Sequence, residues 1–173
     1  MNKKRIQLTL FVDENESEII EKLRKQFNYR QYELIKSHVT LCREHELVKI
    51  QKVTQNLTLL HHHYISIRFG PVERFWDGKG AMMPATGGNV QFQKLREIIL
   101  QEAVKDPLQH PPHITLMHPR NSTCTDSQFE LIEKIKMPAV LEFKKISLIE
   151  QQGENKWAVL KEFDLKSAYL SPK

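Results

Sequence analysis

The sequence HVTL at residues 38–41 recurs almost unchanged as HITL at residues 113–116. In a β-strand, successive side chains point to opposite faces of the sheet. Each stretch therefore places a histidine and a threonine on one face and two aliphatic residues on the other. One such tetrapeptide could be an ordinary half-buried strand, but its repetition with aliphatic residues at both remaining positions makes that interpretation the weaker one. We predict two strands that each present an imidazole beside a hydroxyl.

Two imidazoles and two hydroxyls facing one cleft suit phosphoryl chemistry. An unperturbed histidine titrates near pH ~6.5, so one ring can be neutral while the other is charged. The neutral ring can take a proton from an attacking water or hydroxyl, and the charged ring can protonate the leaving oxygen. The threonine hydroxyls can donate hydrogen bonds to the non-bridging phosphate oxygens. This scheme needs no metal or cofactor, and it leaves open which histidine is the acid and which the base.

Strand and helix patterns alternate around these two stretches. Apolar residues at a period of two predict strands, and apolar residues at helical spacing predict helices. The segment 70–88 carries five of the six glycines and predicts a hairpin with a turn near Asp77-Gly78. The predicted strands are 6–12, 37–42, 64–69, 113–117, 140–150 and 157–165, and the predicted helices are 16–27, 46–57, 92–103 and 126–135.

The order of these elements predicts an α+β fold. Several strands are half-polar, which favours an antiparallel or mixed sheet over a buried parallel one. The succession of strand, helix and His-x-Thr strand occurs once before residue 45 and again before residue 120. No boundary has the composition of a linker, so we expect residues 1–173 to form one domain made of two similar halves.

Composition and charge bound the class of protein. Apolar residues make up 40% of the chain and charged residues 27%, which is typical of a globular protein. A net charge of +5 favours polyanionic partners, nucleotides or nucleic acid before membranes. The acidic run at 13–16 argues against a signal peptide, and no apolar stretch approaches the roughly 18 residues of a membrane span. Cys42 and Cys124 are expected to be inert free thiols in a reducing compartment, so we expect a soluble, cytoplasmic, monomeric protein.

The two His-x-Thr-hydrophobic stretches, 75 residues apart, resemble the signature of the two-histidine (2H) phosphoesterase superfamily, in particular its 2′-5′ RNA ligase-like members. The resemblance covers essentially the whole chain. It implies a bilobed α+β fold in which two pseudo-twofold-related lobes of antiparallel sheet, with outer helices, each contribute one stretch to a central cleft. It also implies that His38 and His113 are catalytic, and that Thr40 and Thr115 bind the phosphate of a nucleotide or RNA end.

Two arginines are further candidates for phosphate contacts. Members of the RNA ligase-like branch often place a basic residue soon after the second motif, whereas here three residues intervene before Arg120. Arg43 lies two residues after the first motif. The strand pattern places it on the face opposite Thr40, unless the strand has ended by then. A solvated surface charge is the alternative for both arginines.

Other conspicuous residues have simpler interpretations. Consecutive histidines at 61–63 cannot easily share one metal ion, so we expect a polar turn there. We expect His110 and His118 to be solvated loop residues, with a supporting role at the site as the alternative. Phe75 and Trp76 lie in the predicted hairpin, where an aromatic ring could stack on a base. Core packing or a lid hinge is the interpretation we favour for them.

The leading hypothesis is a metal-independent phosphodiesterase that hydrolyses 2′,3′-cyclic phosphate or 2′-5′ phosphodiester bonds in RNA ends or small nucleotides. A second hypothesis is RNA end-joining, the reverse reaction, which would use the same groups. A third is a non-catalytic module that binds nucleotides or RNA. A metal-dependent hydrolase is the weakest, because no carboxylate-histidine cluster with ligand spacing is present in the sequence.

Overall fold

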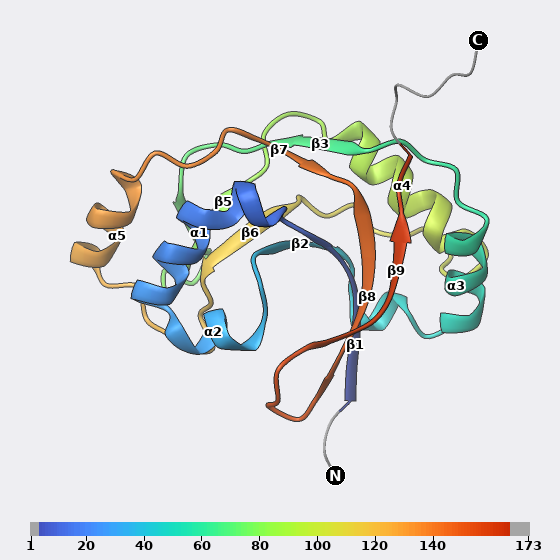
Figure 1. Ribbon diagram of the computed structural model, residues 1–173, viewed down its shortest axis with the longest axis horizontal. Helices are drawn as coiled ribbons and strands as arrows, with labels where there is room; N and C mark the ends of the chain where they lie inside the picture. Colours follow the sequence, from blue (N-terminus) through green and yellow to red (C-terminus); the bar gives the residue numbers. More distant parts are fainter. Residues whose placement is uncertain (1–3, 167–173) are drawn as a thin grey trace.

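A curved, antiparallel seven-stranded sheet in the order β4-β5-β6-β2-β1-β8-β9 forms the centre of the molecule (Figure 1). This computed structural model describes residues 4–166. The strands of the sheet are β1 (Lys4–Phe11), β2 (His38–Cys42), β4 (Glu73–Arg74), β5 (Ala81–Pro84), β6 (His113–Met117), β8 (Lys145–Gln152) and β9 (Ala158–Asp164). A separate antiparallel pair consists of β3 (Ile65–Arg68) and β7 (Val140–Phe143).

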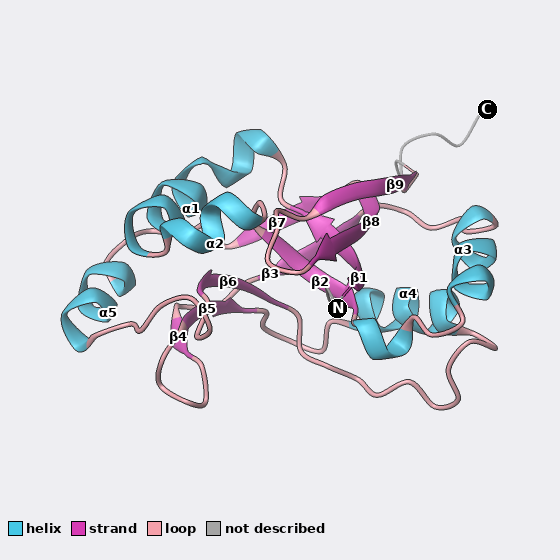
Figure 2. Cartoon of the chain, turned by 90° about the horizontal axis from the view of Figure 1, so that it is seen from below, coloured by secondary structure: helices cyan, strands magenta, loops and turns pink. Residues whose placement is uncertain are grey.

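Five α-helices flank the sheets within residues 4–166. They are α1 (Glu14–Phe27), α2 (Tyr29–Leu34), α3 (Ile50–Thr58), α4 (Val90–Leu100) and α5 (Asp126–Glu133), and a short 3-10 turn, η1, spans Glu44–Glu46. Figures 1 and 2 both show α1, α2 and α5 gathered at one end of the molecule and α3 and α4 at the other. None of these helices is both long enough and apolar enough to cross a membrane. The α+β prediction is confirmed.

Most elements lie where the sequence pattern predicts them, and the exceptions have local causes. The predicted strand 140–150 is wrong as a single element, because the chain changes partner at Lys144: β7 pairs with β3, whereas β8 pairs with β1 and β9. The predicted helix 46–57 begins only at Ile50, after the turn η1. The helix α2 was not predicted; it has only six residues, and the Asn28 side chain caps it by accepting a hydrogen bond from the backbone N–H of Gln31.

The aliphatic residues of the two motifs form part of the main core. Val39, Leu41, Ile114 and Leu116 are all fully buried. Burial of each such side chain stabilises the fold by about 1.5–3 kcal/mol. Both strands therefore have their orientation set by the hydrophobic effect, with the histidines and threonines on the opposite face. Cys42 and Cys124 are buried free thiols whose pKa burial raises, which agrees with the prediction of inert cysteines.

Candidate active site

The two motif strands, β2 and β6, are antiparallel neighbours in the middle of the seven-stranded sheet. Their register aligns the aliphatic residue that follows each histidine. Continued by one residue in each direction, this register places Thr40 opposite His113 and His38 opposite Thr115. Residues directly opposite in an antiparallel pair point to the same face. Each imidazole therefore has the hydroxyl of the other motif as its cross-strand neighbour, and all four side chains are half-buried.

A backbone carbonyl determines the tautomer of each histidine in the same way. The Nδ1–H of His38 donates to the carbonyl oxygen of Lys36 at 2.8 Å, and the Nδ1–H of His113 donates more weakly to the carbonyl oxygen of Pro111 at 3.4 Å. A carbonyl can only accept, so in a neutral ring the proton resides on Nδ1. The lone pair is then on Nε2 in both histidines, and either ring can act as a proton acceptor through that atom.

A phenylalanine packs edge-on against each of the two imidazoles. Phe11 lies directly opposite His38 on β1, and the two ring centroids are 6.0 Å apart. Phe75, from the β4–β5 hairpin, lies 5.6 Å from the ring of His113 at an interplanar angle of 86°. These contacts hold the rings in place and shield them from water.

Burial lowers the pKa of both histidines. It lowers the pKa of His38 to about 4, with a smaller contribution from the positive charge of Arg24, although the hydrogen bond to Lys36 opposes the shift. Burial also lowers the pKa of His113, and the charge of Arg43 adds to the effect. Both rings are therefore neutral near pH 7 when no anion is bound.

A buried ion pair holds the start of β2. Arg24 of α1 is 1% exposed and binds the Glu21 carboxylate at 2.7 Å. Its guanidinium also donates to the carbonyl oxygen of Ile35 at 2.8 Å, and Glu21 accepts the backbone N–H of Ser37. The residue before His38 is thereby tied to α1.

A second buried ion pair holds the end of β2. Arg96 of α4 binds the Glu46 carboxylate at 2.5 Å, and Glu46 also accepts the backbone N–H of Arg43. The Arg96 guanidinium donates to the carbonyl oxygen of Leu41 and, at 2.9 Å, to that of Leu108. This one side chain therefore connects the end of the first motif with the segment that leads into the second.

The structure contradicts the prediction that His110 and His118 are solvated loop residues. The Nε2–H of His110 donates to the backbone carbonyl of Thr40 at 3.1 Å, and its ring packs edge-on against Phe92. His118 accepts the backbone N–H of Arg120 at its Nδ1. Burial lowers the pKa of each to about 4. His110 thus supports Thr40 through the backbone, which is the alternative role considered above.

The two candidate arginines occupy different positions. β2 ends at Cys42, so Arg43 lies beyond the strand, and its exposed guanidinium is close enough for its charge to lower the pKa of His113. Arg120 is also exposed, and its charge acts on His118 and Arg5. The sequence argument overlooked Arg5, although strand alternation places it on the same face of β1 as Phe11.

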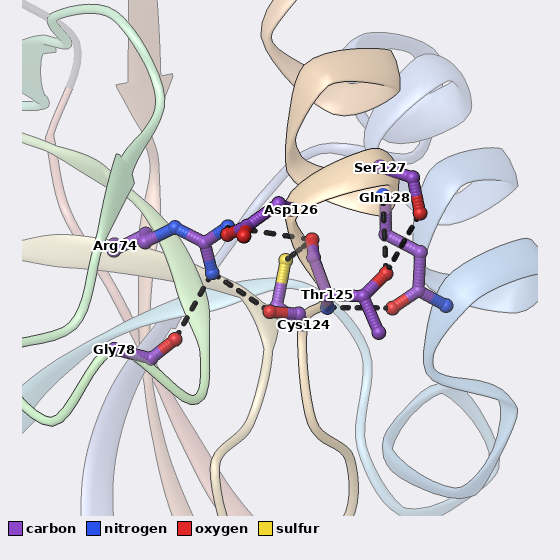
Figure 3. Close-up of polar contacts among 7 residues, drawn as sticks. All are labelled: Arg74, Gly78, Cys124, Thr125, Asp126, Ser127 and Gln128. Atoms are coloured by element: carbon purple, nitrogen blue, oxygen red, sulfur yellow. Dashed lines mark hydrogen bonds and ion pairs between the residues drawn. The ribbon is translucent and has the colours of Figure 1, made fainter.

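The β4–β5 hairpin that carries Phe75 is firmly anchored (Figure 3). The Arg74 guanidinium donates to the carbonyl oxygens of Gly78 and Cys124 at 3.0 and 2.7 Å and pairs with Asp126 at the start of α5. Figure 2 shows the loop of this hairpin projecting from the sheet. Trp76 at its tip is 96% exposed, so core packing is wrong for this residue.

Gly80 closes the same hairpin. A Cβ at this position would lie 2.5 Å from the carbonyl oxygen of Met117 and 2.7 Å from the Phe75 ring, so only glycine fits.

Within residues 4–166, no three His, Cys, Asp or Glu side chains gather as a metal-binding group.

Comparisons with known proteins identify the superfamily and the fold of this chain. The profile of the 2′-5′ RNA ligase superfamily matches residues 11–155. No curated protein matches the chain at a significant level. Among solved structures, Escherichia coli LigT complexed with 3′-AMP has a TM-score of 0.65 at 14% identity, with 95% of this chain and 99% of that chain covered. LigT has also been solved with ATP and with NADP+.

Two further structures have the same fold. One is described as a phosphoesterase, with a TM-score of 0.64 at 13% identity, covering 95% of this chain and all of that one. The other is from Thermus thermophilus, with a TM-score of 0.57 at 16% identity and the same coverage. Such low identities demonstrate a shared fold and no more. The superfamily profile, by contrast, spans most of the sequence, and the chain therefore belongs to the 2′-5′ RNA ligase superfamily of 2H phosphoesterases.

Proposed function

We propose that this protein is a metal-independent phosphodiesterase that hydrolyses 2′,3′-cyclic phosphate or 2′-5′ phosphodiester bonds in RNA ends or small nucleotides. The observation that carries the proposal is the crossed register of β2 and β6, in which the histidine of each motif lies opposite the threonine of the other. Each imidazole has its lone pair on Nε2 and lies across the strand pair from the other motif's threonine. The two proposed proton-transfer groups and the two proposed hydrogen-bond donors therefore share one face of two neighbouring strands, which supports joint binding of one phosphate group.

The reaction follows from these groups. One neutral imidazole takes a proton from water through Nε2 as the water oxygen bonds to phosphorus. The other imidazole, protonated, gives its proton to the leaving oxygen as the P–O bond breaks. The hydroxyls of Thr40 and Thr115 donate to the non-bridging oxygens, where negative charge accumulates. The two imidazoles exchange protonation states in each turnover, and solvent restores them.

We include Arg43 and Arg120 in the proposed phosphate-binding set. Arg43 has the stronger support, because its positive charge is close enough to His113 to lower the pKa of that histidine. A guanidinium there would attract an anionic substrate and offset the negative charge of the transition state. Arg120 lies beside His118 and would contact a more distant phosphate of a longer substrate.

The site also supports the proposed twofold relation between the two halves of the chain. His38 has a carbonyl partner two residues earlier and a phenylalanine at its ring, and His113 has the same two neighbours. We further propose that residues 1–173 act as one cytoplasmic, monomeric domain. The seven-stranded sheet supports the single domain, because it joins segments from Lys4 to Asp164.

The direct test is hydrolysis of 2′,3′-cyclic nucleotides and 2′-5′ dinucleotides in the presence of EDTA. We expect turnover that EDTA does not reduce. Inhibition by EDTA that added metal reverses would contradict the proposal. The same groups serve the reverse reaction, so products should also be analysed with RNA 5′-hydroxyl ends present. Joined products would identify the end-joining activity, and tight binding without turnover would indicate a binding module.

The lowered pKa values predict an unusual pH dependence. In the free protein, the imidazole that acts as the acid must be protonated although its pKa is below 6.5. For a phosphodiester substrate, kcat/KM should therefore fall about tenfold per pH unit between pH 7 and 9. A bound anionic phosphate raises the pKa of the imidazoles, so the kcat profile should be displaced to higher pH. A kcat/KM that is constant over this range would contradict the prediction, because it would require an acid whose pKa in the free protein is raised far above the ordinary histidine value.

A further inference from the structure

A cavity of about 500 Å³, here called the side pocket, lies near the first motif. Its lining includes Phe11, Ile35, Lys36, Lys145, Trp157 and Val159. Two of these residues contact His38 directly: Phe11 packs against the ring, and the Lys36 carbonyl accepts its Nδ1–H. The volume falls within the range of roughly 300–1,000 Å³ that is typical of small-ligand sites.

The side pocket has a fixed aromatic wall. The backbone N–H of Trp157 donates to the carbonyl oxygen of Leu34 at 2.9 Å, which brings the start of β9 against the end of α2. The guanidinium of Arg5 lies 5.2 Å from the centre of the Trp157 ring, in a cation–π contact that orients the indole. A planar, apolar ring system such as a nucleobase can stack on a wall of this kind.

The charges around the side pocket favour an uncharged ligand. The lining contains four lysines and four carboxylates. Lys36 pairs with Glu14 at 2.6 Å, and Lys145 pairs with Glu162 at 3.2 Å. The paired side chains are polar and can still bind ribose hydroxyls. Because their charges cancel, the pocket has little net electrostatic field that would attract a second phosphate. The guanidinium of Arg43, which has no ion-pair partner among residues 4–166, by contrast acts on His113, at the other imidazole of the candidate site.

We propose that the side pocket binds the nucleoside that is joined to the scissile phosphate through its 5′ oxygen, with its base against Trp157. This inference rests on the proposed function and narrows its substrate class. A 2′-5′-linked dinucleotide has a second nucleoside to occupy the pocket, whereas a 2′,3′-cyclic mononucleotide does not. The protein should therefore be selective for the dinucleotide.

The test is to fill the side pocket from its exposed edge with Val159→Trp. Val159 is 52% exposed, and the adjacent Leu160, which does not line the pocket, is 53% exposed, so Leu160→Trp is a matched control. Val159→Trp should lower kcat/KM for a 2′-5′ dinucleotide by about tenfold or more, the weight of one base-stacking contact, while turnover of a cyclic mononucleotide stays within about twofold. Equal losses on both substrates, or no loss on either, would overturn the proposal.

Binding can be measured independently of turnover. In a Trp76→Phe protein, Trp157 is the sole tryptophan, so its fluorescence reports on the side pocket alone. A 2′-5′ dinucleotide should quench this fluorescence, and a cyclic mononucleotide should not. If the wild-type protein hydrolyses neither compound, the proposed function fails, and the fluorescence titration still decides the pocket: quenching supports a nucleoside site, and its absence excludes one.

Discussion

Replacing either His38 or His113 with alanine should lower turnover by about two to four orders of magnitude, the usual contribution of general acid–base catalysis. In the proposed reaction each imidazole has a separate role, since one removes a proton from the nucleophile while the other protonates the leaving oxygen. Neither can substitute for the other, because each Nδ1 is committed to a backbone carbonyl and only one Nε2 per ring remains. Single-turnover kinetics on a 2′,3′-cyclic nucleotide in EDTA would measure both losses.

Two comparisons make this result specific. His61→Ala removes an exposed histidine whose ring contacts Lys166 and should leave turnover within about twofold of wild type, because surface residues away from a site rarely matter. The double variant of His38 and His113 should lose little more than either single variant, because the two rings act as a unit. Wild-type turnover in both single variants would exclude paired-histidine catalysis.

Replacing Arg96 with methionine should lower the free energy of unfolding by about 3–5 kcal/mol, the cost of breaking a buried ion pair. Arg96 is 2% exposed, and its partner Glu46 has a side chain that is 7% exposed. The substitution leaves this carboxylate buried and unpaired, and the carbonyl oxygens of Leu41 and Leu108 lose a donor. Urea denaturation with a two-state fit would measure the loss.

The control variants distinguish the stability lost by breaking the ion pair from the effect of changing an arginine side chain to methionine. Arg120→Met changes an exposed arginine and should alter stability by less than about 0.5 kcal/mol. Combining Arg96→Met with Glu46→Leu removes the stranded charge and should recover a substantial part of the loss. If Arg96→Met does not fold, Arg96→Lys provides an intermediate case that keeps the charge. A loss below about 1 kcal/mol in Arg96→Met would show that the pair is not important for stability.

The elements around the site differ in how far local sequence predicts them. The strands of the two motifs were predictable because the alternation of polar and aliphatic side chains is a property of adjacent residues. The helix α2 was not, since six residues are too few to show a helical period. The division of 140–150 into β7 and β8 was also not predictable, because the apolar pattern continues across Lys144. Only the partner strand changes there, from β3 to β1.

The surroundings of the histidines outside the motifs were also not predictable from local sequence. Sequence offers no sign that His110 is half-buried, since it stands among prolines and polar residues that are typical of a loop. Its environment comes from Phe92 on α4 and from the carbonyl of Thr40, which lies 70 residues earlier. Contacts over such separations depend on how the whole chain packs, and no local pattern encodes them.

The sequence by itself determined the chemical groups of the candidate site and the face of the sheet on which each lies, because side-chain direction along a strand follows from the strand's period of two. Only the tertiary structure decided that β2 and β6 pair in the crossed register, that Phe11 and Phe75 pack against the two imidazoles, and that burial lowers the pKa of His38. It alone showed that Phe11 and Lys36, which contact His38, also line the side pocket. The physical reason is that register, burial and electrostatic surroundings arise from residues distant in sequence, which meet only once the sheet has formed.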